Sequence, residues 1–167
     1  MTPVPVTAAV ARATVGAARD DDLRLALDRV HEPDGSPGNV AAYHFDMMVD
    51  AARAGTISLR IGVSERLIRY AGQVGFAVDA AFRGRRIAER ATRLLFPLAL
   101  SHGLDPLWIG CNPDNAASRR TIERLGGVFV ELVDLPPDYD RYISRGERQK
   151  LRYRIDLGGA VSAAPSL

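Results

Sequence analysis

Arginines and small residues gather in one short segment, residues 82–90, which reads FRGRRIAER. Apolar residues at helical spacing follow it, so we expect a helix to begin here. The first amides of a helix are unpaired and lie at the positive end of its dipole, and guanidinium groups pair with phosphate oxygens. These residues predict a phosphate-binding turn, with a solvated basic helix start as the alternative interpretation.

The turn lies inside a unit of alternating strands and helices, residues 72–127. Residues 67–78 (LIRYAGQVGFAV) predict a strand, and its two glycines indicate a bulge or the close approach of a backbone or a ligand. A helix follows, and its late Pro97 is expected to kink it or end it early. LWIGC at residues 107–111 then predicts a strand buried on both faces. Strand, helix and strand in this order imply a right-handed parallel crossover.

The rest of the chain predicts a sheet around this unit. Residues 112–115 are cap residues of a second helix that ends at two glycines, 126 and 127. We expect an antiparallel hairpin with a turn near Ala54 and Gly55. Alternating apolar residues predict strands near residues 23–30, 42–50, 56–63, 128–135 and 149–157. The expected fold class is α/β (α+β), a mixed, mostly antiparallel sheet with one central parallel strand pair and helices on its faces.

Length and composition predict one globular domain. The 167 residues are 47% hydrophobic and 25% charged, which suits a domain at residues 19–157 with a flexible arm at 1–18 and a disordered tail at 158–167. The net charge is only +2, and its even spread argues against nucleic acid as a partner. We expect no metal, because there is one cysteine and the three histidines have no ligand spacing. Lacking a bilayer-length apolar run or a signal-peptide pattern, the chain is expected to be cytoplasmic and without a membrane partner.

Two motifs together resemble those of the GNAT acyltransferase superfamily. The first resembles R-x-x-G-x-G/A at the turn after the fourth strand, and the second resembles N-x-x-S/A-x-x-x-x-E-x-x-G, at the spacing expected of the family. The resemblance covers residues 23–157 and is more specific than either motif alone. The matching residues are Arg83, Gly84, Arg85, Arg86, Ile87 and Ala88 in the first motif, and Asn115, Ser118, Glu123 and Gly126 in the second.

The resemblance implies that acyl-CoA binds between the two strands of the central pair, which splay apart. The turn would hold the pyrophosphate, while amides near Phe76 and Val78 would hold the pantetheine arm and polarise the thioester carbonyl. Asn115 would contact the cofactor from the end of the second strand. The implied cofactor-binding set is Phe76, Val78, Arg83, Gly84, Arg85, Arg86, Ile87, Ala88, Asn115 and Ser118.

The function implied by the resemblance is N-acyl transfer, most simply of acetyl from acetyl-CoA, by direct attack of an amine on a small molecule or a protein. Dimers are common among such proteins, so a homodimer is also considered. An acyl-CoA-binding sensor or partner module without turnover is the alternative. A Rossmann-type nucleotide binder is a weaker one, because no G-x-G-x-x-G follows a strand.

Two positions depart from the family pattern. Arg86 replaces a glycine, and we interpret it as compatible, on the expectation that this position has helical backbone angles. Ile122 replaces the tyrosine that many members use to protonate the leaving thiolate, so the acid must come from elsewhere. Tyr153 and Tyr142 are the predicted substitutes, with Tyr139 as a further phenol. For Tyr153, ordinary packing in a strand is the alternative.

Other candidate groups are less specific. Asp46 is the predicted general base, and His44 and Glu131 are alternatives on strands that could face the acceptor. Cys111 is expected to be a buried, inert thiol. The basic residues 145–154 are interpreted as a solvated strand edge, or as a site for an acidic acceptor or a phosphate.

Overall fold

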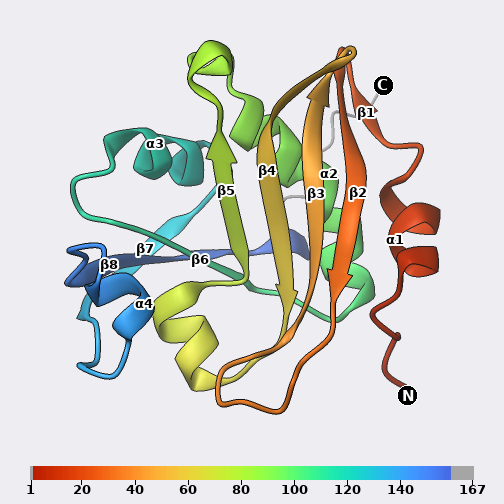
Figure 1. Cartoon of the computed structure of the whole chain (residues 1–167). Helices are drawn as coiled ribbons and strands as arrows, with labels where there is room; N and C mark the ends of the chain where they lie inside the picture. Colours follow the sequence, from red (N-terminus) through yellow and green to blue (C-terminus); the bar gives the residue numbers. More distant parts are fainter. Residues whose placement is uncertain (1, 159–167) are drawn as a thin grey trace.

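The computed structural model describes residues 2–158 and contains two antiparallel sheets that diverge from each other (Figure 1). The first has the order β1-β2-β3-β4-β5 and the second the order β6-β8-β7. The strands are β1 (Arg19–Asp20), β2 (Leu23–His31), β3 (Ala41–Val49), β4 (Ala52–Ile61), β5 (Val74–Val78), β6 (Leu107–Cys111), β7 (Val128–Asp134) and β8 (Gln149–Ile155). The helices are α1 (Ala8–Val15), α2 (Ile87–Ser101), α3 (Ala116–Arg124) and α4 (Asp140–Ile143), with a π-helix η1 (Leu67–Ala71) and a 3-10 turn η2 (Ala80–Phe82).

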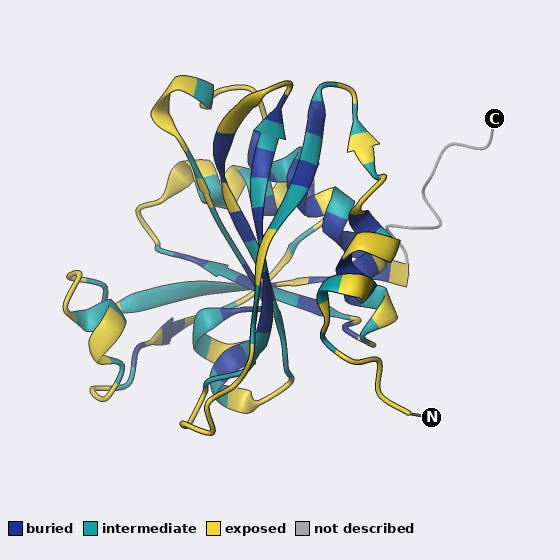
Figure 2. Cartoon of the chain, turned by 45° about the vertical axis from the view of Figure 1, so that its right-hand side comes forward, coloured by how far each residue is buried: buried dark blue, intermediate teal, exposed yellow. Residues whose placement is uncertain are grey.

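The first sheet has one apolar and one polar face, because its residues alternate. On β3, Tyr43, Phe45 and Met47 are buried in the core against α1 and α2, whereas His44 and Asp46 lie on the opposite face. Figure 2 shows the buried positions concentrated along the strands and on the inner sides of the helices. The predicted β3–β4 hairpin is confirmed. Its turn lies at residues 50–51 rather than at Ala54 and Gly55, which are inside β4.

The N-terminal prediction was wrong. The segment expected to be a flexible arm contains α1, which begins where the hydroxyl of Thr7 accepts a hydrogen bond from the Val10 amide at 3.2 Å. Ala11 and Val15 are buried in the main core, so α1 is part of the domain. The predicted tail beyond Gly158 lies outside the described residues.

The strand predicted at residues 67–78 is two elements. Its first part is the π-helix η1 and only Val74–Val78 form β5. The predicted helix after the arginine turn is confirmed as α2, and it continues through Pro97 to Ser101. Within residues 2–158, no helix is both long and apolar enough to cross a bilayer.

Candidate active site

A cleft of about 530 Å³ lies where the two sheets diverge. Residues of β4 and β5 form one wall, and the end of β6 forms the other. The first turn of α3, the helix α4 and Lys150 of β8 close its sides. The splayed strand pair expected from the sequence is therefore present, with β5 and β6 in different sheets and a cavity between them.

The edge of β5 supplies backbone donors to this cleft. The Arg60 amide donates to the Gln73 carbonyl at 2.7 Å and the Asp79 amide donates to the Ala54 carbonyl at 2.8 Å. Hydrogen-bonded and non-hydrogen-bonded pairs alternate along an antiparallel ladder. The amides of Val74, Phe76 and Val78, which lie at the alternate positions, therefore point away from β4 and toward the gap. The predicted amides of Phe76 and Val78 are therefore among those directed into the gap, and their role in binding a cofactor stays a prediction.

One glutamine joins the two sheets where they begin to separate. The Gln73 amide donates to the Trp108 carbonyl at 2.7 Å, and its side-chain oxygen accepts from the Trp108 amide at 2.8 Å. The side-chain nitrogen donates to the Gly62 carbonyl at 2.8 Å, and the residue is 1% exposed. A Cβ on Gly72 would lie 3.1 Å from the Ile109 Cα. The glycine thus allows the close backbone approach that the sequence indicated.

The arginine turn lies at the far end of β5, at the exposed start of α2 (Figure 1). Gly84 has φ of 80° and Arg86 has φ of 55°, so both are left-handed. The expectation of helical angles at Arg86 was wrong, and the family's preference for glycine there follows from this backbone conformation. Arg83 and Arg85 are exposed, whereas the side chains of Ile87 and Ala88 are buried and leave only their amides for a ligand.

Sequence comparison agrees with this geometry. The family model described as "Acetyltransferase (GNAT) domain" matches residues 7–128. The chain belongs to the GNAT acetyltransferase family. This confirms the family resemblance stated from the two motifs. A search of curated proteins gives no significant match.

Solved structures with the GNAT fold are similar at low sequence identity. RimJ from Mycobacterium smegmatis, in complex with CoA-disulfide, has a TM-score of 0.55 at 20% identity over 75% of this chain and 56% of that one. The self-immunity acetyltransferase MccE, in complex with acetyl-CoA and AMP, has a TM-score of 0.52 at 19% identity over 69% and 61%. RimL, a ribosomal L7/L12 alpha-N-protein acetyltransferase, has a TM-score of 0.53 at 19% identity over 70% of both. This GNAT chain thus spans less than two thirds of the MccE and RimJ chains.

The second GNAT motif lies at the cleft. Asn115 caps α3, where its side-chain oxygen accepts from the Ser118 amide at 3.1 Å. Both residues line the cleft. The oxygen of Asn115 accepts this bond, and no hydrogen bond within the described residues uses its side-chain NH₂ group, which is free to donate to a ligand. Ile122 is fully buried in the core, so this position contributes packing and no proton donor.

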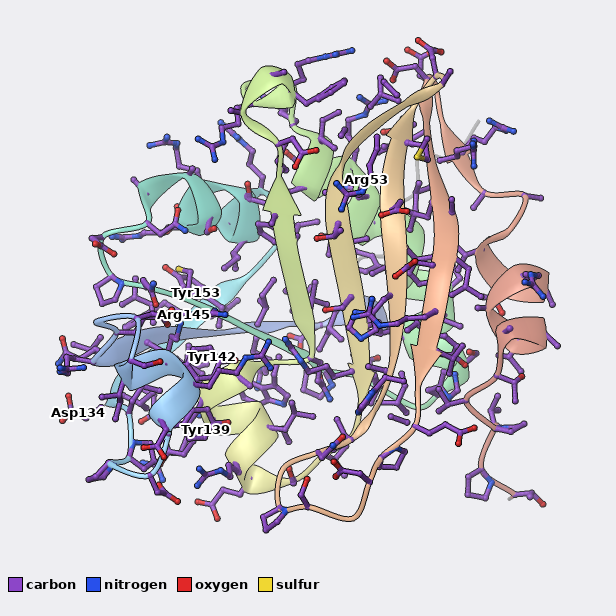
Figure 3. All side chains as sticks on the ribbon, in the orientation of Figure 1. Arg53, Asp134, Tyr139, Tyr142, Arg145 and Tyr153 are labelled. Carbon is purple, nitrogen blue, oxygen red and sulfur yellow. The ribbon has the colours of Figure 1, made fainter. Side chains whose placement is uncertain are left out.

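Of the predicted catalytic tyrosines, the structure brings Tyr142 into the cleft and not Tyr153. Tyr142 extends from α4, and the Lys150 ammonium lies 4.9 Å from its ring centroid (Figure 3). Tyr153 is 1% exposed, packs edge-on against Phe129 and has its hydroxyl 3.5 Å from Glu123 Oε1. Burial raises its phenol pKa. The packed strand tyrosine is therefore the better interpretation of Tyr153, and its catalytic role stays a prediction without structural support. Tyr139 stacks on Tyr142, with its ring covered by Arg66.

The predicted base Asp46 is held elsewhere. Its carboxylate accepts from Arg53 Nε at 2.8 Å, toward the upper end of β4 (Figure 3), and it does not line the cleft. His44, two residues earlier on β3, does line it. Burial, and then the positive charges of Arg29 and Arg60, lower the His44 pKa below its ordinary value of 6.5. At neutral pH the His44 imidazole is uncharged and can accept a proton.

A row of small and polar residues connects His44 with β5. Ser58 pairs with His44 on one side and with Gly75 on the other. A Cβ on Gly75 would lie 3.3 Å from both Ser58 Oγ and Arg60 Nη2, so the glycine keeps this part of the cleft open. The other predicted groups lie as follows: Glu131 pairs with Arg152 at 2.9 Å on the second sheet, and Cys111 lines the cleft as a buried thiol whose pKa is raised by burial.

Several cleft residues were missed from the sequence. Ser58 and Arg60 stand at the polar positions of an alternating strand, which marks a face but not what that face meets. Arg141 stands between the strands predicted at residues 128–135 and 149–157, in a segment without a predicted element. Only the tertiary fold, by placing α4 against η1, brings it to the cleft.

Proposed function

We propose that this protein is an acyl-CoA-dependent N-acyltransferase that transfers acetyl from acetyl-CoA to an amine by direct attack. The observation that carries the proposal is the cleft at the divergence of β5 and β6, bordered by the outward amides of β5. A linear thioester arm fits such a cleft because its amide groups can pair with an unpaired strand edge.

The residues at the α2 end of β5, along β5 and on the opposite wall suit this cosubstrate. At one end, the amides that begin α2 and the side chains of Arg83, Arg85 and Arg86 offer donors to a pyrophosphate. Along β5, the amides of Phe76 and Val78 would bind the arm, and one of them would polarise the thioester carbonyl. The NH₂ group of Asn115 would contact the arm from the opposite wall.

The chemistry needs two proton transfers. The bound acyl-CoA would supply a carbonyl carbon to which the acceptor nitrogen bonds as the carbon–sulfur bond breaks. His44 would take a proton from the acceptor amine, through water where the amine does not reach it directly. Tyr142 would donate a proton to the leaving sulfur, since a phenol hydroxyl within reach of a thiolate can act as a general acid. Holding both substrates in the cleft supplies much of the rate acceleration.

An acyl-CoA-binding module without turnover is the second candidate. The burial of Ile122, where many GNAT members carry the acid, favours it. Both candidates require cosubstrate binding, whereas only the enzyme releases thiol.

Calorimetric titration with acetyl-CoA, combined with a thiol-release assay on a panel of amines, tests the proposal. We expect binding and amine-dependent release of CoA. Binding without release for any amine would establish the module, and no binding at all would contradict both candidates.

A further inference from the structure

Three arginines line the cleft, two of them from α4 and the residues just after it. Arg60 comes from β4, Arg141 from α4 and Arg145 from the residues just after it, and all three line the cleft. Among residues 2–158, no aspartate or glutamate lines it. We call Arg60, Arg141 and Arg145 the acceptor-side arginines.

These charges are not neutralised by the ion pairs around them. Lys150, a fourth cation of the cleft, is paired with Glu147 and donates to Asn112 at 2.6 Å. The neighbouring Arg66 and Arg152 pair with Asp138 and Glu131. No ion pair within residues 2–158 uses an acceptor-side arginine. Arg60 donates from Nη1 to the Gly72 carbonyl at 3.1 Å and retains further donors.

The acceptor-side arginines lie away from the arginine turn, Arg83 to Arg86, which we call the phosphate turn because of its proposed role. The start of α2 lies beyond the upper end of β5, whereas α4 lies beside its lower end (Figure 1). α4 is held against η1 by the Arg66–Asp138 pair at 3.1 Å and by Tyr70 and Tyr139, with ring centroids 5.5 Å apart. Arg145 and Tyr142 are labelled on this side in Figure 3.

We infer that the acceptor carries a negatively charged group, a carboxylate or a phosphate, close to its reactive amine, and that Arg141 and Arg145 bind this group with help from Arg60. The inference rests on the proposed acyltransferase function. Clustered cations in a cleft without carboxylates repel one another, and an anion relieves that repulsion. Guanidinium groups recognise carboxylates and phosphates through paired, charge-assisted hydrogen bonds.

Matched acceptors test the inference. The pairs are glycine and glycinamide, phosphoethanolamine and ethanolamine, and the amidated peptides Ser-Asp-Asp and Ser-Asn-Asn, which separate small molecules from a protein terminus. We expect kcat/KM to be about tenfold or more higher for the anionic member of at least one pair, the size of one good charge-assisted contact. The double substitution R141E/R145E should abolish this preference, mainly through KM, and leave the Kd for acetyl-CoA within about twofold.

The control is R12E/R19E, which makes the same charge change at exposed positions on α1 and β1. It should retain the preference. Equal kcat/KM for both members of every pair would overturn the inference. So would R141E/R145E if it weakened acetyl-CoA binding about tenfold and kept the preference, because the arginines would then serve the cosubstrate.

Calorimetric binding of the same pairs to the CoA-bound protein gives a second measurement that does not need turnover. Selective binding of an anionic member, lost in R141E/R145E, supports the inference even if no amine releases thiol. Selective binding without thiol release would contradict the proposed enzymatic function but not the inference about the anionic group. Binding that does not distinguish the members of any pair would overturn the inference.

Discussion

The two arginine groups at opposite ends of β5 differ in what surrounds them. The phosphate turn, Arg83 to Arg86, combines exposed guanidinium groups with the backbone amides that begin α2, and Arg85 lies 3.3 Å from Asp22. The acceptor-side arginines come from β4, from α4 and from the residues just after α4, and they border a cavity that no aspartate or glutamate of residues 2–158 lines. Local sequence encodes the first group, whereas tertiary packing assembles the second. The phosphate turn should therefore determine cosubstrate affinity, and the acceptor-side arginines should determine acceptor selectivity. His44 would act between the two groups, and Tyr142 would act beside the acceptor-side arginines.

The largest effect is expected in this middle region. His44→Gln should lower kcat about 100-fold, because it removes a proton acceptor. The affinities for acetyl-CoA and for the acceptor amine should stay close to those of the unmodified protein. The His44 pKa is lowered, so its neutral form persists below pH 6.5 and activity should fall only as the pH drops through that lower value. Steady-state kinetics from pH 5 to 9 measure both.

His102→Gln is the control. The His102 pKa is also lowered by burial, but its Nε2 lies 2.9 Å from the Tyr43 hydroxyl, outside the cleft. This change should lower the stability of the protein. In the enzyme that remains folded, the loss of activity at acidic pH should be unchanged. An unchanged kcat in His44→Gln would remove the histidine as the base.

Charge reversal in the phosphate turn comes next. Arg83→Glu should weaken acetyl-CoA binding at least about tenfold, because a carboxylate would face the pyrophosphate. The anion preference among acceptors should persist, in contrast to R141E/R145E. Calorimetry and circular dichroism measure affinity and folding. An unaltered dissociation constant in a folded protein would sink the assignment of the turn.

Tyr142 and Tyr153 allow a phenol that lines the cleft to be compared with one that is buried in the core. Tyr142→Phe should lower kcat about tenfold with little change in the Kd for acetyl-CoA, because it removes a proton donor that lines the cleft. Tyr153→Phe should keep its kcat, since that hydroxyl is buried near Glu123. The opposite result in thiol-release kinetics would restore Tyr153 as the acid.

The smallest effect concerns the backbone of the turn. Arg86→Gly should relieve a left-handed backbone conformation that costs roughly 1–2 kcal/mol in a residue other than glycine. Glycine also gives the unfolded chain more freedom, which offsets roughly 0.4–1 kcal/mol of this gain. We expect a net gain of about 0.5 kcal/mol and a Tm about 1–2 °C higher by calorimetry. A lower Tm would show that the Arg86 side chain stabilises the fold.

The strands and both family motifs could be predicted because they depend on local patterns. Alternation of Tyr43, Phe45 and Met47 identified a half-buried strand, and Asn115 is a helix cap within its own motif. The same logic failed where two local patterns compete. Residues 67–71 are apolar enough for a strand but form a π-helix, and the π-helix leads into the left-handed Gly72 that meets β6.

Other features depended on signals that were overlooked or are not local. Thr7, with Ala8, Ala11 and Val15 at helical spacing, could have indicated α1. The convergence of Arg60 and Arg141, about 80 residues apart in the sequence, has no local signature, because it follows from how the second sheet and α4 pack on η1. The left-handed angle of Arg86 has no signal in the arginine itself, but the glycine that the family pattern has at this position could have indicated it.

Gln73 fixes the point from which the length of β5 along the cleft is counted. Its side chain supplies the carbonyl that Trp108 would otherwise find on a neighbouring strand, so the two sheets stay joined here and separate beyond it. From this closed end, five strand residues at roughly 3.3 Å each lead toward the phosphate turn. If the turn holds the pyrophosphate as proposed, the length of β5 would determine how far the acyl end of the cosubstrate reaches along the cleft. Adding two residues to β5 would preserve its alternation and shift that reach by roughly 7 Å.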